Sequence, residues 1–208
     1  MKKTLLTIAL VSAVAFANAQ NKMWLGGTIS YSTESYDPDP EEFSSLVFGP
    51  NFGYMVNDKL AVGLGITYNS QSASNLNDGA GETYDATQTQ LTFLPFVRMY
   101  KSLGEKVAIY GEFAIGIGSG SYSEEHSDGN DPDDQDFSTL SFNLSPGIQY
   151  WFADRWSINA QWGAIRYATR TDEDAAMDSN GDVVDAKTND FSIGLDLSNM
   201  NFGLNYHF

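Results

Sequence analysis

The sequence contains no cysteine, so disulfide bonds cannot contribute to its stability. A disordered chain would also be poor in aromatic residues, whereas this one contains 13% Phe, Trp and Tyr together with 19 glycines. We therefore expect a folded protein whose stability comes from side-chain packing and from main-chain hydrogen bonds between strands.

Basic residues are scarce. The chain has 11 Lys and Arg against 27 Asp and Glu, which gives a formal net charge of −16. Binding to nucleic acid depends on cations that neutralise phosphates, so no nucleic-acid partner is expected.

Long apolar runs are missing except near the start of the chain. Residues 1–3 are Met-Lys-Lys, residues 5–17 are mostly apolar, and Ala17 and Ala19 are small. This pattern predicts a signal peptide at 1–19 that is cleaved after Ala19. An uncleaved anchor is less favoured, because the run falls short of the ~20 residues that span a bilayer. We expect residues 20–208 to form a single domain.

The dominant pattern in that domain is alternation with a period of two, which marks strands with two different faces. It is clean over residues 60–69, 107–118, 140–152 and 156–163. One face carries bulky apolar residues such as Leu64 and Phe113, and the other carries Gly, Ala, Ser and Asn. Bulky apolar side chains fit better outside a narrow barrel than inside it, because the interior of an eight-stranded barrel is small.

Four further strands are predicted from weaker alternation, at about residues 23–33, 45–56, 87–100 and 191–208. In the last one, the apolar residues change from odd positions (Phe191 to Leu197) to even positions (Met200 to Phe208). A change of phase needs an extra residue, so a β-bulge is expected near Ser198 and Asn199. Pro50, Pro95 and Pro146 also fall within predicted strands, and we expect each at a bulge or at a locally unpaired position.

The connections between the predicted strands alternate in length. Three are short (57–59, 101–106 and 153–155) and four are long (34–42, 71–86, 123–136 and 170–189). The long connections hold 21 of the 27 acidic residues. Outer-membrane barrels have short periplasmic turns and longer external loops. The predicted fold is therefore all-β: an eight-stranded, antiparallel, up-and-down transmembrane β-barrel with acidic external loops.

The segment 48–68, FGPNFGYMVNDKLAVGLGITY, resembles the small outer-membrane β-barrel domain family, to which OmpX and the membrane domain of OmpA belong. The ending 202–208, FGLNYHF, is similar as well. The resemblance implies location in the outer membrane and assembly by the barrel-assembly machinery, with Phe202, Leu204, Tyr206 and Phe208 as the signal. It carries no catalytic motif, so no enzymatic activity is expected.

Two charged residues fall on the inward face of one predicted hairpin. Arg98 and Glu112 are expected to form an ion pair in the barrel interior, because a buried charge needs a partner. If Arg98 lies opposite Tyr110, then Glu112 is its diagonal neighbour. The pair is interpreted as structural, and re-pairing as a gate is the alternative.

The external loops offer one weak metal site and one weak acid–base pair. Closely spaced carboxylates repel one another unless a cation neutralises them, so loose Ca²⁺ or Mg²⁺ binding is a hypothesis for the loop at 123–136. Its candidate ligands are Glu124, Glu125, Asp128, Asp131, Asp133 and Asp134. His126 lies among these carboxylates, but a solvated loop residue is the preferred interpretation. No other cofactor is expected.

The sequence favours an integral outer-membrane protein, a monomer with a plugged lumen and a structural or surface-interaction role. Its expected surroundings are outer-membrane lipid and lipopolysaccharide. The first alternative is an OmpW-like transporter of small molecules or a narrow porin, against which the polar inward face argues. The second is a secreted, soluble barrel that binds a ligand, in which the larger side chains would have to face inward.

Overall fold

The computed structural model describes residues 22–35, 37, 41–77, 82–129, 131–177, 183–194 and 200–208. The predicted signal peptide and the bulge expected near Ser198 and Asn199 lie outside these residues. The strands are β1 (Met23–Ser35), β2 (Glu42–Asn57), β3 (Leu60–Asn77), β4 (Thr83–Ser102), β5 (Val107–His126), β6 (Gln135–Ala153), β7 (Trp156–Trp162), β8 (Ile165–Met177), β9 (Val183–Ile193) and β10 (Met200–His207).

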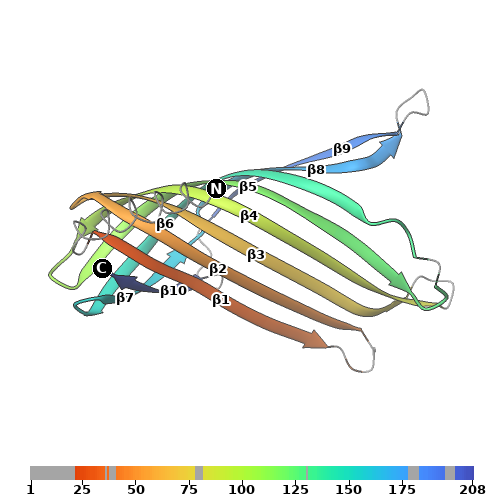
Figure 1. The fold of residues 1–208 in the computed structure, drawn as a ribbon, viewed down its shortest axis with the longest axis horizontal. Coiled ribbons are helices and arrows are strands. Elements are labelled where there is room, and N and C mark those ends of the chain that lie inside the picture. Colours follow the sequence, from red (N-terminus) through yellow and green to blue (C-terminus); the bar gives the residue numbers. More distant parts are fainter. Residues whose placement is uncertain are drawn as a thin grey trace, which may run out of the picture.

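Eight of these strands close into a ring. Each strand from β1 to β6 pairs antiparallel with the next one along the chain. The ring is then closed by pairing of β7 with β10 and of β10 with β1. The fold is therefore a closed, eight-stranded antiparallel barrel, as predicted (Figure 1). Among the described residues, none forms a helix long and apolar enough to cross a membrane.

The predicted strand 156–163 is observed as β7, and a separate strand, β8, follows it. Gly163 and Ala164 separate β7 from β8, so that β6 pairs with β7 at one end and with β8 at the other. Along the neighbouring pairs, Ile193 of β9 is paired with Ile165 of β8, and Met200 of β10 is paired with Trp162 of β7.

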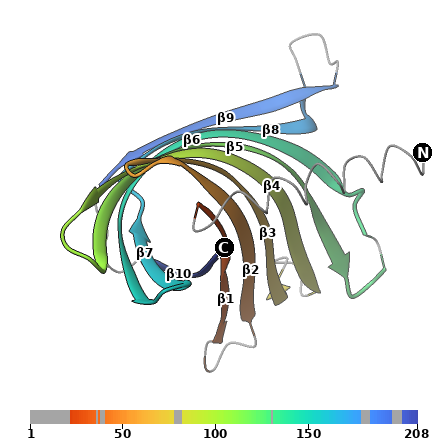
Figure 2. The ribbon, with the colours of Figure 1, turned by 60° about the vertical axis from the view of Figure 1, so that its left-hand side comes forward.

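The wall is complete only at the end of the barrel that holds the short turns. Four residue pairs join β1 to β10, from Trp24–His207 to Gly27–Leu204, whereas thirteen join β1 to β2. Beyond Gly27, β1 pairs only with β2 among the described residues. The hairpin of β8 and β9 stands away from β1 in both views (Figures 1 and 2). We call this gap between β1 and β9 the seam.

Near the complete end of the wall, the two ends of the described chain are held together. The amide of Phe208 donates to the carbonyl of Met23 at 3.0 Å, and the amide of Met23 donates to the carbonyl of Phe208 at 3.4 Å.

Two of the four long connections, 71–86 and 170–189, are mostly strand, which corrects their predicted loop boundaries. The predicted loop 71–86, for example, contains the end of β3 up to Asn77 and the start of β4 from Thr83. Outward positions above Tyr68 and Leu91 carry Ser70, Thr89 and Ser119 instead of apolar residues. The strands thus continue beyond the apolar band as polar extensions, because ladder hydrogen bonds do not require apolar side chains.

The three strand prolines lie where the ladder is interrupted on one side, as predicted. The β2–β3 register omits Pro50, the β4–β5 register omits Pro95, and the β6 registers with β7 and β8 omit Pro146. Each proline still has a partner on its other side. A proline lacks the N–H that the missing rung would need.

Candidate functional site

The centre of the barrel interior is the ion pair of Arg98 and Glu112. Alternation along β4 and β5 turns both side chains inward, and the two residues are directly opposite each other. This corrects the predicted register, in which Arg98 faced Tyr110; Tyr110 is paired with Tyr100 instead. The Arg98 Nη2–Glu112 Oε2 distance is 2.6 Å, and Nε donates to the same oxygen at 2.8 Å. The residues are only 4% and 9% exposed.

Four aromatic rings surround the Arg98 guanidinium. Its Cζ lies 4.3 Å from the ring centroid of Tyr110, 5.3 Å from that of Phe96, 5.5 Å from that of Trp24 and 5.9 Å from that of Tyr100. A cation is attracted by ring faces at these distances. The rings therefore replace part of the hydration that the guanidinium loses on burial, and the carboxylate of Glu112 supplies the opposite charge.

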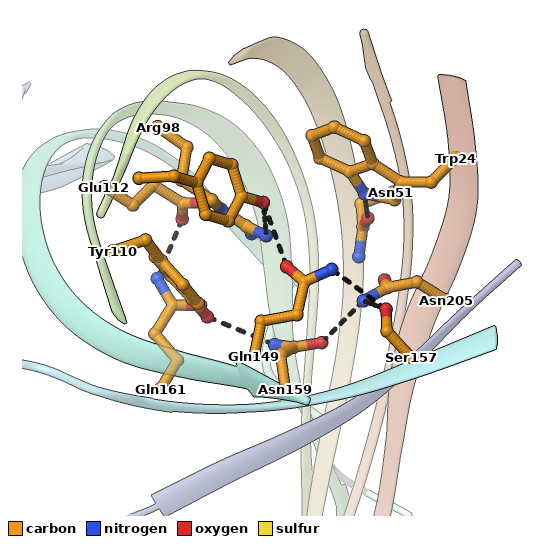
Figure 3. Close-up of polar contacts among 11 residues, drawn as sticks. Trp24, Asn51, Arg98, Tyr110, Glu112, Gln149, Ser157, Asn159, Gln161 and Asn205 are labelled. Atoms are coloured by element: carbon orange, nitrogen blue, oxygen red, sulfur yellow. Dashed lines mark hydrogen bonds and ion pairs between the residues drawn. The ribbon is translucent and has the colours of Figure 1, made fainter. Parts of the chain in front are cut away.

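A chain of hydrogen bonds carries the network across the lumen (Figure 3). Arg98 donates to the hydroxyl of Tyr100 at 3.1 Å, and that hydroxyl donates to Gln149 at 3.0 Å. Gln149 in turn donates to Ser157 at 2.9 Å. Asn205 lies 3.4 Å from the Ser157 oxygen and donates to Asn159 at 3.0 Å. The chain thus runs from β4 through β6 and β7 to β10.

Two further bonds close the network around Glu112. Asn159 donates to the Tyr110 hydroxyl at 3.2 Å, and Gln161 donates to Oε1 of Glu112 at 2.8 Å. Both carboxylate oxygens of Glu112 are therefore bonded, one to Arg98 and the other to Gln161. Such a fully connected network in a low-dielectric interior is rigid, because breaking one bond leaves another group unpaired. We call this set of residues the lumen network.

Sequence reasoning placed Arg98 and Glu112 inside the barrel but missed other members of its interior. Trp24 is 1% exposed and donates to Asn51 at 3.1 Å, and Asn205 is 2% exposed. His207 is also buried, with Nε2 2.8 Å from the Ser157 oxygen. Alternation next to the outward residues Leu25, Leu204 and Tyr206 was the signal that could have identified them.

A second cation lies in the interior nearer the end of the barrel that carries the long connections. The guanidinium of Arg170 on β8 lies 3.7 Å from the ring centroid of Phe137, which is 2% exposed. Arg170 also pairs with Asp172 at 2.6 Å and donates to Gln88 of β4 at 3.0 Å. It therefore ties the β8–β9 hairpin to the opposite wall.

The acidic residues proposed as metal ligands do not gather. Within the described ranges, no three His, Asp or Glu side chains are placed to hold a metal ion. Glu124 accepts from the Tyr122 hydroxyl at 2.6 Å and lies 3.3 Å from His126 Nε2, and Asp131 accepts from the His126 amide. The bond to Glu124 raises the pKa of Tyr122 to about 12. Glu125, Asp128, Asp133 and Asp134 are exposed.

The last strand carries the predicted assembly residues on its outer face. Phe202 and Leu204 are exposed, whereas Asn205 and His207, on either side of Tyr206, point inward and are buried. Tyr206 packs edge-on against Trp156 at 5.0 Å, and Arg155 in the adjacent turn donates to its hydroxyl at 3.2 Å, which raises the pKa of Arg155. Aromatic residues at this level are typical of the interface between membrane and water.

An outward apolar band, a polar interior and closure without a free edge at one end together define an integral membrane β-barrel. The chain belongs to the family described as the outer membrane protein beta-barrel domain, which matches residues 4–208. Its location is the cell outer membrane. The family therefore excludes the alternative of a secreted soluble barrel.

Comparison with solved structures finds other outer-membrane proteins at low sequence identity. Ail, the attachment invasion locus protein of Yersinia pestis, solved with the heparin analogue sucrose octasulfate, is 15% identical with a TM-score of 0.47, over 90% of this chain and 97% of Ail. OprG from Pseudomonas aeruginosa is 14% identical (TM-score 0.43; 91% and 98%), and Neisserial surface protein A is 10% identical (0.39; 91% and 98%). No curated protein matches the chain.

Proposed function

We propose that this protein is a non-catalytic outer-membrane barrel with a plugged lumen, whose polar strand extensions make interactions at the cell surface. The observation that carries the proposal is the lumen network, which joins β4, β5, β6, β7 and β10 inside the closed part of the wall. A hydrated ion would have to separate these paired groups, and an unpaired buried polar group costs ~1–3 kcal/mol.

Conductance across a planar lipid bilayer tests the plug. The purified, refolded protein is expected to give no stable single-channel current. The variant Arg98→Ser with Glu112→Ser removes the central pair and is expected to give small, brief openings. Stable channels from the unmodified protein would refute the plugged lumen.

The partners proposed for the barrel follow from its two surfaces. The apolar band faces outer-membrane lipid, and the acidic extensions face lipopolysaccharide, with Ca²⁺ or Mg²⁺ bridging the two anionic surfaces. Phe202, Leu204, Tyr206 and Phe208 are proposed as the residues that the barrel-assembly machinery reads, and the barrel is proposed to act as a monomer.

The seam favours a second candidate function, passage of small apolar molecules from the extracellular mouth sideways into the membrane. Such a route would lie above the lumen network and would leave at the base of the seam, just above the last pair of β1 and β10, Gly27–Leu204. Ile29→Cys with Phe202→Cys extends the existing β1–β10 register by two positions, in a chain without other cysteines. A disulfide there is expected to stop uptake of an apolar solute into proteoliposomes if the route exists. Unchanged uptake after complete cross-linking would exclude the route.

A further inference from the structure

A groove of about 690 Å³ lies on the concave side of the strand extensions. It is formed by β1, β2, β3, β4 and β5 at the level where the outer surface has already become polar. The groove is open to solvent, and its volume falls in the range of small-molecule sites.

The deeper level of the groove is a row of neutral hydrogen-bonding side chains. Successive cross-strand pairs place Ser32 next to Ser45, Ser45 next to Gln71, Gln71 next to Gln88, and Gln88 next to Tyr122. All five residues line the groove. Strands are spaced about 4.8 Å apart, so the row extends over about 19 Å, which suits a short oligomer better than a single small molecule.

The level above is an apolar strip between two carboxylates. Phe43 is paired with Ala73, and Ala73 with Ala86, and all three line the groove. Glu34 flanks the strip next to Phe43, and Glu124 flanks it next to Ala86. Phe43 is 37% exposed, so part of this residue is accessible to a ligand.

The lining selects against anions. Among the described residues, the lining includes no Lys or Arg. The guanidinium of Arg170, which bonds to the lining residue Gln88, is already paired with Asp172 and lies over the ring of Phe137. An uncharged oligosaccharide matches both levels: the C–H face of a sugar ring packs on an aromatic or methyl surface, and its hydroxyl groups bond to amides, hydroxyls and carboxylates.

We propose that this groove binds an uncharged oligosaccharide at the cell surface. The ligand lies along the row from Ser32 to Tyr122, with a sugar ring on Phe43 and hydroxyl groups donated to Glu34 and Gln71. The inference deepens the proposed surface-interaction role and rests on it. It does not depend on whether the lumen is plugged, because the groove lies above the lumen network.

Isothermal titration calorimetry of the refolded protein tests the inference, in a zwitterionic detergent that contains no sugar. The probes are maltotriose, mannotriose and tri-N-acetylchitotriose, with a polysulfated disaccharide as the anionic comparison. At least one neutral trisaccharide is expected to bind with a Kd between about 10 μM and 1 mM, and the polysulfated disaccharide is not. If none of the three neutral probes binds in this range, the inference is wrong.

Variants locate the binding. Gln71 is exposed, so Gln71→Leu removes hydrogen-bonding groups without disturbing a packed interior; together with Phe43→Ala, it is expected to weaken binding about tenfold. Gln135 of β6 is the matched control. It is exposed and is paired with Tyr122 of β5, but it does not line the groove. Gln135→Leu is expected to leave the Kd within about twofold.

If Gln71→Leu with Phe43→Ala weakens binding no more than Gln135→Leu does, the saccharide binds elsewhere and the inference is wrong. Heat-modifiable migration on gels verifies that each variant is folded. Because conductance is measured separately, failure of saccharide binding is distinguishable from failure of the plugged lumen.

Discussion

Removal of the Arg98 side chain is the sharpest test of what holds the barrel interior together. Arg98→Ala deletes the ion pair with Glu112, the bond to Tyr100 and the contacts with four aromatic rings. It leaves the Glu112 carboxylate, 9% exposed, with the Gln161 amide as its remaining side-chain donor.

The expected loss of stability follows from this geometry. Breaking a buried ion pair by removing one partner costs ~3–5 kcal/mol, because the other charge stays buried without compensation. In a chain of this size, 1 kcal/mol corresponds to a shift in Tm of about 2–4 °C, so Arg98→Ala is expected to lower the Tm by about 6–20 °C. Arg98→Lys keeps the charge but cannot make the two bonds that Nε and Nη2 donate to Oε2 of Glu112, and an intermediate shift is expected.

The assays are thermal unfolding of the refolded barrel in detergent, which gives the Tm, and urea unfolding, which gives the free energy of unfolding. Both are followed by tryptophan fluorescence and by heat-modifiable gel migration. Arg166→Ala is the matched control, since Arg166 is exposed on the inward face of β8; its expected effect is within ~0.5 kcal/mol. A double-mutant cycle with Glu112→Ala should give a coupling energy of ~1–3 kcal/mol. Additive effects of the two alanine substitutions, or an unchanged unfolding curve for Arg98→Ala, would refute the reasoning.

Three further predictions concern other parts of the wall. A Cβ at Gly53 would meet the buried indole of Trp24, so Gly53→Ala should cost ~1–3 kcal/mol in urea unfolding, whereas Gly163→Ala, in open space, should be near neutral. Phe208→Ala should lower the amount of protein in the outer membrane severalfold, and Phe152→Ala, an exposed aromatic outside the last strand, should not. The hydrogen bond that Tyr122 donates to Glu124 should persist below pH 10. It should be lost as the pH rises through about 12, because the pKa of Tyr122 is raised to about 12 and the deprotonated hydroxyl can no longer donate. In an absorbance titration Glu124→Gln should return this tyrosine towards its ordinary pKa, and no change would contradict the assignment.

The sequence predicted the faces of the strands better than their lengths. Alternation over residues 60–69 and 107–118 separates lipid from lumen, and the structure has the same residues outward. Above the apolar band both faces are polar, so alternation disappears although the ladder continues to Asn77 and His126. Main-chain hydrogen bonds between strands do not depend on which side chains are present. The polar ends of the strands were therefore predicted as loops.

The interior could be predicted only in part, for a related reason. Arg98 and Glu112 lie on neighbouring strands. Both are at inward positions of the alternation, and the β4–β5 hairpin places them opposite each other. Trp24 reaches Arg98 from β1, which is not a neighbour of β4 in the ring. Contacts across a lumen depend on barrel diameter and strand tilt, and neither follows from a local pattern.

Because Met23 and Phe208 are hydrogen-bonded to each other, the same ring of strands could be built from a circularly permuted chain. A short linker between these residues would convert the meeting of β1 and β10 into an ordinary hairpin, and new ends could be opened between β5 and β6 without changing any strand neighbour. In such a permuted barrel, four pairs of residues would no longer have to join the two extremes of the chain. The seam would then be an internal feature of one continuous polypeptide segment.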